Sequence, residues 1–123
     1  MSELHLTVDD VTLTATWSEE NADLRAALAD ALPVSGDATR WGDELYFEVP
    51  VDAVPATTTE ALPVGAIAYW PAGNALCLFW GPTPASSRTE PRAAAPVGVV
   101  AHIDDPTPLD GIDGGAHVTV ERR

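Results

Sequence analysis

Lysine is absent from this chain of 123 residues, and all six basic residues are arginines. Nineteen acidic residues give a formal net charge of -13 at pH 7. Because such a surface repels phosphate and anionic lipid, we expect neither nucleic acid nor a membrane as a partner. The acids also repel one another in dilute buffer, whereas ~1 M salt shortens the Debye length to about 3 Å. This composition, rich in Ala, Thr and Val, predicts an acidic halophilic protein.

Cysteine and long apolar runs are nearly missing as well. Cys77 is the single cysteine, which excludes an intramolecular disulfide and favours a reduced compartment. Its neighbours Leu76 and Leu78 suggest a small core residue rather than a nucleophile. No segment approaches the ~20 apolar residues that span a bilayer, and Met1-Ser2-Glu3 lacks the pattern of a signal peptide. We therefore expect a cytoplasmic protein.

Motifs for metal, nucleotide and covalent chemistry are also lacking. Only His102, with Asp104 and Asp105, brings metal-ligand types together, and Ser86-Ser87 has no nucleophile motif around it. The sequence therefore predicts no metal site and no cofactor, and it identifies no catalytic residue. The other two histidines are isolated: His5 and His117. The paired acids are expected on the solvated surface: Asp9-Asp10, Glu19-Glu20, Asp43-Glu44 and Asp104-Asp105.

The residues that are present predict one domain over residues 1–123, with 46% hydrophobic content for its core. Residues 4–8 and 11–17 alternate as in a hairpin, and apolar residues recur at helical spacing from Leu24 to Leu32. Further strands are expected at residues 45–49, 66–70, 75–80, 97–103 and 117–120. Loops are expected at residues 35–37, 85–95 and 104–115. Short strands with one helix favour a closed or nearly closed antiparallel barrel with a helical cap, and an open sandwich is the alternative.

The densest apolar block, YWPAGNALCLFWGPTP, joins two of these strands through a turn at residues 71–74. Period-two alternation divides it between two faces. We expect one face to be core and part of the other to be covered by the helix, which leaves an aromatic edge for binding. The first face comprises Ile67, Tyr69, Leu76, Leu78 and Trp80; the second comprises Ala66, Ala68, Trp70, Cys77 and Phe79.

Three segments, WGDELYFEVPV, VGAIAYWPAGNALCLFWGPTP and PRAAAPVGVVAHI, resemble in sequence and order the short prokaryotic cyclophilin-like family. The resemblance implies a mainly β fold, a closed antiparallel eight-stranded barrel capped by one main helix. Larger relatives, the true cyclophilins, are peptidyl-prolyl isomerases. In them an arginine donates to the prolyl nitrogen beside an apolar pocket.

Matched to the isomerases, this chain lacks their catalytic groups. The strand at residues 45–50 has no arginine, and Phe47 or Glu48 falls at that position. Val51-Asp52-Ala53 replaces a Phe-Met pair, and the matching strand at residues 96–100 lacks the histidine. Isomerisation by the usual mechanism is therefore not expected.

Two functions follow from the resemblance and the residues. The preferred one is a module that binds a peptide, protein or small ligand in an apolar groove, with little or no isomerase activity. The alternative is an isomerase that uses a relocated arginine, with Arg40, Arg88 and Arg92 as candidates. A monomer or a weak homodimer is expected. The candidate binding residues are Tyr46, Phe47, Glu48, Tyr69, Trp70, Phe79, Trp80, Thr83 and Arg92.

Overall fold

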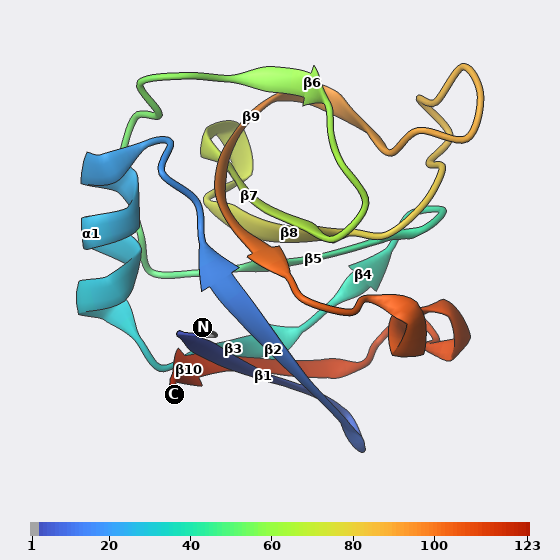
Figure 1. Cartoon of the computed structure of the whole chain (residues 1–123), viewed down its shortest axis with the longest axis horizontal. Coiled ribbons are helices and arrows are strands. Elements are labelled where there is room, and N and C mark those ends of the chain that lie inside the picture. The colour runs from blue at the N-terminus through green and yellow to red at the C-terminus, as the bar shows by residue number, and fades with distance from the viewer. Residues whose placement is uncertain (1–2) are drawn as a thin grey trace.

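Antiparallel strands make up most of the regular secondary structure in the computed structural model, which describes residues 3–123 (Figure 1). Met1 and Ser2, the first two residues of the N-terminal segment that lacks a signal-peptide pattern, lie outside the described residues. The strands are β1 (Leu4–Val8), β2 (Val11–Trp17), β3 (Val34–Asp37), β4 (Thr39–Arg40), β5 (Glu44–Glu48), β6 (Thr59–Ala61), β7 (Ala66–Trp70), β8 (Ala75–Phe79), β9 (Arg92–Ile103) and β10 (His117–Arg122). The helices are α1 (Ala22–Ala31) and the 3-10 helices η1 (Pro71–Gly73) and η2 (Thr107–Gly111).

The predicted hairpin is confirmed as β1 and β2, which pair in register around Asp9, a residue with a φ of 50°. The predicted helix is confirmed as α1, with Leu24 and Leu28 buried. Its N-cap Asn21 has a φ of 54° and makes no side-chain capping bond. Instead, the Asn21 amide donates to Val99 O at 3.0 Å and accepts from Thr57 N at 2.8 Å. The N-terminus of α1 is thereby fixed to β9.

One predicted loop, at residues 35–37, is wrong, and another, at residues 85–95, is wrong in part. Residues 35–37 belong to β3, because β10 supplies a pairing partner for a segment whose Ser-Gly-Asp composition favours a loop. Residues 92–95, expected in a loop, begin the 12-residue strand β9. Its first residues pair with the three-residue strand β6. Tertiary pairing outweighs local propensity in both segments.

The strands form one sheet in the order β3-β10-β1-β2-β9-β7-β8-β5-β4, and β6 pairs with β9 beside that path. The expected closed eight-stranded barrel is therefore corrected: ten strands are present in residues 3–123, and hydrogen bonds do not close the sheet. The two ends of the order, β3 and β4, are consecutive in the chain and separated by Ala38. Because β3 runs directly into β4, these edges continue one another instead of pairing side by side.

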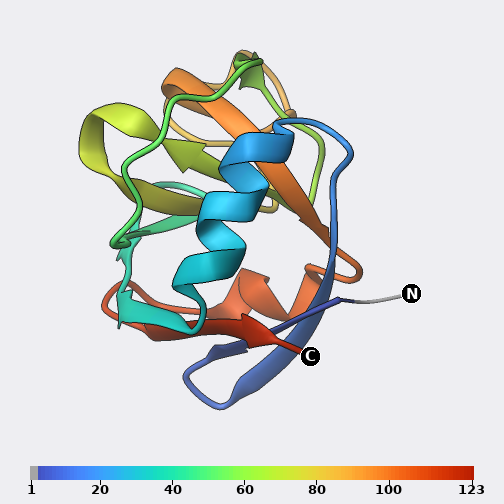
Figure 2. The same ribbon diagram turned by 90° about the vertical axis from the view of Figure 1, so that its left-hand side faces the viewer.

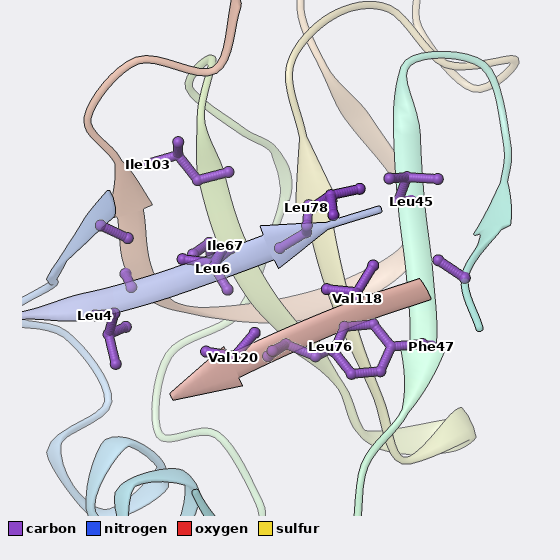
Figure 3. Packing of buried hydrophobic residues seen from close by; sticks show 14 of the residues in the cluster. Leu4, Leu6, Leu45, Phe47, Ile67, Leu76, Leu78, Ile103, Val118 and Val120 are labelled. Carbon is purple, nitrogen blue, oxygen red and sulfur yellow. The ribbon is translucent and has the colours of Figure 1, made fainter. Parts of the chain in front are cut away.

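The main hydrophobic cluster lies inside the curve of this sheet. Side chains from β1 and β10 point toward those from β5, β7 and β8 (Figure 3). The first predicted face, with Ile67, Tyr69 and Leu76, belongs to this cluster, as do Leu24 and Leu28 of α1. Helix α1 lies between the upper and lower strands at one side of the molecule (Figure 2). It therefore covers the first face and not the second, which corrects the expected placement.

The second predicted face forms a separate cluster on the opposite side of β7 and β8. Ala66, Ala68, Cys77 and Phe79 are buried there, and Trp70 packs against them. Their cover comes from β6 and β9, with Leu62, Ala93, Val97 and Val99. No helix in residues 3–123 combines the length and apolar character needed to cross a membrane.

Candidate binding pocket beside the second cluster

A cavity of about 140 Å³ opens beside the second cluster, between β5, β8 and the beginning of β9. We call it the aromatic pocket. Most of its lining is apolar, and Glu44 supplies the acidic group. The lining residues are Trp41, Glu44, Tyr46, Trp70, Cys77, Ala93, Ala94, Ala95 and Val97.

Strand alternation brings the floor of the pocket together. Glu44 and Tyr46 are two residues apart on β5, so both point to the face opposite Leu45 and Phe47. Tyr46 pairs with Cys77 of β8, which places Glu44 diagonally across from the thiol. Trp70, at the end of β7, completes this side.

A bulge in β9 forms the opposite wall. Arg92 pairs with Ala61, and Val97 pairs with Thr59, so two steps along β6 match five along β9. Residues 93–96 therefore bulge from the ladder beside the pocket. Three of them are alanines, whose small side chains leave room for the cavity. Bulges commonly occur next to binding and active sites.

Three half-buried aromatic residues surround the space. The rings of Tyr46 and Trp70 meet edge to face, with centroids 6.3 Å apart and planes at 84°. Trp41 lies in the turn before β5, where its backbone N–H donates to the backbone oxygen of Glu44 at 2.9 Å. The Trp70 indole N–H is buried and has no hydrogen-bond partner among the described residues. The pocket thus offers several ring surfaces and one unpaired donor in its walls.

Burial in the wall of the pocket perturbs the acidity of Glu44. Its side chain is buried, with 6% of the residue exposed. Burial raises its pKa from 4.5 to about 7, and a hydrogen bond with Cys77 partly opposes that rise. The Cys77 thiol is the donor, because the bond favours the charged carboxylate. Burial and the nearby Glu44 carboxylate raise the pKa of Cys77 well above its usual range, so it remains a thiol near neutral pH.

Sequence reasoning missed Glu44. The pair Asp43-Glu44 was expected on the surface, but Glu44 is buried because the bulge of β9 covers it from 50 residues away in the chain. The available signal was its position: Glu44 shares a strand face with Tyr46, opposite Leu45 and Phe47. Cys77 was expected in the core and is buried, but its acidic neighbour comes from another strand.

The structure separates the nine candidate residues. Tyr46 and Trp70 line the aromatic pocket. Phe47 and Tyr69 lie in the main cluster, where the Tyr69 hydroxyl donates to Val51 O at 2.6 Å. Phe79 is fully buried in the second cluster. The remaining four are dispersed. Glu48 is exposed, and buried Trp80 lies beside a second hollow with Asp43 and Pro106. The hydroxyl of buried Thr83 donates to the backbone oxygen of half-buried Arg92.

No arginine among residues 3–123 lines the aromatic pocket. The Arg40 guanidinium donates to Gly42 O, Ile112 O and Asp43, and stacks over Trp80 at 5.2 Å from the ring centroid. Arg92 precedes the bulge, but its side chain forms ion pairs with Glu90 at 3.5 Å and Glu60 at 3.9 Å. Arg88 is exposed in the loop before β9.

No group of three or more His, Cys, Asp or Glu side chains in the described chain is arranged to hold a metal ion. His117 lies 3.0 Å from Asp37 at the surface. Asp104, expected near His102 at a strand end, accepts hydrogen bonds from Thr14 at 2.9 Å and Thr16 at 3.1 Å. That carboxylate links β2 to the end of β9.

A curved antiparallel sheet, one helix and an apolar pocket beside it define a cyclophilin-type scaffold. The family model described as cyclophilin-like matches residues 2–121, and the chain belongs to this family. Its fold is similar to the solution structure of a hypothetical protein from Archaeoglobus fulgidus, with a TM-score of 0.82 and 34% identity over 99% of this chain and 95% of that one. None of the curated proteins compared with the chain matches it.

Proposed function

We propose that this protein is a cyclophilin-like binding module that holds a small apolar or aromatic-stacking group in the aromatic pocket, with little or no prolyl isomerase activity. The observation that carries the proposal is a cavity with aromatic walls and no lining arginine among residues 3–123. Small-molecule sites are typically apolar clefts with a few polar groups. Here the polar groups include those of Glu44, Tyr46 and Cys77, together with the Trp70 indole.

The size of the pocket limits what can enter. Sites for drug-sized ligands usually measure about 300 to 1,000 Å³, whereas an engineered apolar cavity of about 150 Å³ accommodates benzene. A cavity of about 140 Å³ therefore suits one side chain of a peptide, or one ring of a small ligand. A peptide, a protein loop and a free small molecule all meet this condition.

The charges around the pocket argue against catalysis of prolyl isomerisation. Rotation about an X-Pro bond must cross a barrier of about 18 to 20 kcal/mol, and each tenfold rate gain requires about 1.4 kcal/mol. A cation near the prolyl nitrogen would supply part of that stabilisation. The pocket presents the Glu44 carboxyl instead, and a negative charge there would repel the electron pair that localises on the prolyl nitrogen as the bond rotates.

Solution NMR with toluene and with an X-Pro dipeptide amide as probes tests the binding function in molar KCl. We expect toluene to shift the indole N–H signals of Trp41 and Trp70. Ala95→Phe should abolish the shifts by filling the pocket, whereas Ala56→Phe, at an exposed site outside it, should preserve them. Shifts that survive Ala95→Phe, or no shifts with either probe, would contradict the proposal.

The alternative function is an isomerase that uses Arg92. Its support is the position of Arg92, directly before the bulge that walls the pocket. A protease-coupled assay on an X-Pro peptide in molar KCl separates the two functions. We expect the uncatalysed rate; an acceleration that disappears in Arg92→Ala and persists in Arg88→Ala would establish the alternative.

We also propose that nucleic acid and anionic membranes are not partners, and that the protein is cytoplasmic and a monomer or weak homodimer. The net charge of -13 disfavours nucleic acid and anionic membranes as partners, and the absence of a disulfide agrees with a cytoplasmic location. Sedimentation in molar KCl tests the proposed monomer or weak homodimer.

A further inference from the structure

The aromatic pocket combines three aromatic residues with one carboxyl group. Tyr46 and Trp70, whose rings meet edge to face, both line the cavity, and Trp41 lines it from the turn before β5. The face of an aromatic ring attracts a cation within about 6 Å of its centroid. Three such residues beside Glu44 favour positive charge in the cavity, and no basic residue in the described chain lines it.

Glu44 also distinguishes this pocket from a purely apolar one. Burying a carboxyl group costs free energy unless an opposite charge or hydrogen bonds compensate for lost water. The Cys77 thiol, a weak donor, is the side chain that hydrogen-bonds to it. An uncharged apolar ligand would leave this cost in place, whereas a cationic ligand would offset it.

The walls specify which kind of cation fits. A guanidinium carries five N–H donors and a primary ammonium carries three, so each would need several acceptors. The side chains that line the pocket include few acceptors besides Glu44 and Tyr46. A quaternary ammonium has no N–H group, and its methyl groups can contact Ala93, Val97 and the aromatic rings.

We propose that the aromatic pocket binds a methylated ammonium group, with Glu44 as its counter-ion and Trp41, Tyr46 and Trp70 as the surrounding aromatic walls. This inference rests on the proposed function of the pocket as a binding site and names its ligand class. Two sources share this chemistry: a free methylammonium solute and a methylated lysine side chain of a peptide.

Binding is expected to depend on pH through Glu44. Cys77 faces it from β8, and Tyr46 lies beside it on β5; the pocket residues from β7 and β9 do not titrate. Nearby, Asp43 pairs with Arg40, and Arg92 pairs with Glu60 and Glu90. A bound cation favours the carboxylate and lowers the pKa of Glu44 from about 7. Affinity should therefore rise several-fold from about pH 6 to about pH 8, with release of a proton on binding.

Calorimetric titration in molar KCl with choline and its uncharged carbon isostere, 3,3-dimethyl-1-butanol, tests the inference. We expect choline to bind at least about tenfold more tightly than the isostere at about pH 8. Glu44→Gln should remove that preference, and Glu48→Gln, the same change at an exposed site on the same strand, should keep it. Trp41→Leu tests the aromatic wall and should weaken choline binding without involving the buried carboxyl.

Equal affinity for choline and the isostere would overturn this inference while leaving an apolar binding pocket in place. A choline preference that is undiminished in Glu44→Gln, or choline binding that is unchanged in Trp41→Leu, would overturn it as well. A trimethyl-lysine peptide distinguishes the two sources: tighter binding of the peptide indicates a methylated protein partner, and equal binding indicates a free solute. If neither choline nor the peptide binds, the inference fails, and toluene binding separately decides the proposed function.

Discussion

Glu44 is the acidic group of the aromatic pocket, and burying its carboxylate costs free energy of folding. Its carboxyl is buried among aromatic and apolar groups, and its pKa is raised to about 7 by that burial. In the unfolded chain the carboxyl returns to an ordinary pKa of about 4.5. Between these values the unfolded state binds fewer protons than the native state, so the native state loses relative stability as pH rises.

This difference predicts how Glu44→Gln changes stability with pH. The stabilising contribution of protonated Glu44 is fully present below about pH 4.5 and is lost as pH rises through about 7. Each pKa unit corresponds to about 1.4 kcal/mol, so the loss amounts to up to about 3 kcal/mol. The free energy of unfolding of Glu44→Gln, relative to the native protein, should therefore increase across this range when measured with denaturant in molar KCl.

Glu48→Gln is the matched control, because Glu48 is exposed on the same strand. Its stability relative to the native protein should show a much smaller change over the same range. If Glu44→Gln and Glu48→Gln follow parallel curves, Glu44 is not the perturbed group.

At the scale of elements, the pocket depends on how short segments hold its aromatic rings. The turn at η1 packs closely against Trp70, and a Cβ added at Gly73 would lie 2.5 Å from the Cε3 and Cζ3 atoms of that ring. The glycine therefore permits the position of Trp70 that forms one wall. Asn74, with a φ of 46°, ends the turn and donates to Val51 O.

Gly73→Ala should displace the Trp70 ring. We expect a loss of about 1 to 3 kcal/mol in stability from the steric overlap, together with weaker toluene binding and a changed Trp70 signal by NMR. Gly111→Ala is the control, because an added Cβ there meets no atom within 4 Å. Unchanged toluene binding in Gly73→Ala would show that Trp70 does not form a wall of the binding site.

Elements with strong local patterns were predictable, and those made by distant pairing were not. The alternation in β1 and β2 and the spacing of Leu24 and Leu28 come from the residues themselves. The two faces of β7 and β8 were also predicted correctly, because alternation fixes them. Strand β3 forms through its pairing with β10, whose residues lie 80 or more positions away in the chain.

The candidate site was predictable only in part, for the same reason. Tyr46 and Trp70 followed from the aromatic density of their strands, and both line the pocket. The burial of Glu44 depends on the bulge in β9, which arises from unequal pairing with β6. Nothing in the local sequence around Glu44 specifies that cover.

At the scale of the whole molecule, charge dominates behaviour in solution. The net charge of -13 is accompanied by ion pairs that are all partly exposed where the structure describes them, such as Arg40 with Asp43 and Arg92 with Glu90. Exposed ion pairs contribute little stability, so salt is the more effective means of reducing repulsion. Membership of the cyclophilin-like family explains the fold of the chain and not its acidic surface.

Stability should therefore increase with salt. We expect the Tm to rise from dilute buffer to molar KCl, with the steepest rise where the Debye length falls below about 10 Å. A variant with Glu19→Gln, Asp52→Asn and Asp113→Asn, which neutralises three exposed acids, should depend less on salt. Identical salt dependence in this variant and the native protein would contradict repulsion as the cause.

We propose that the pocket of this cyclophilin-like fold binds a ligand without promoting rotation about a prolyl bond. Two-dimensional exchange NMR on an X-Pro peptide, with and without the protein in molar KCl, measures that rotation. We expect the cis and trans signals of the peptide to exchange no faster in the presence of the protein. Exchange cross peaks that appear with catalytic amounts of protein and vanish in Ala95→Phe would contradict it.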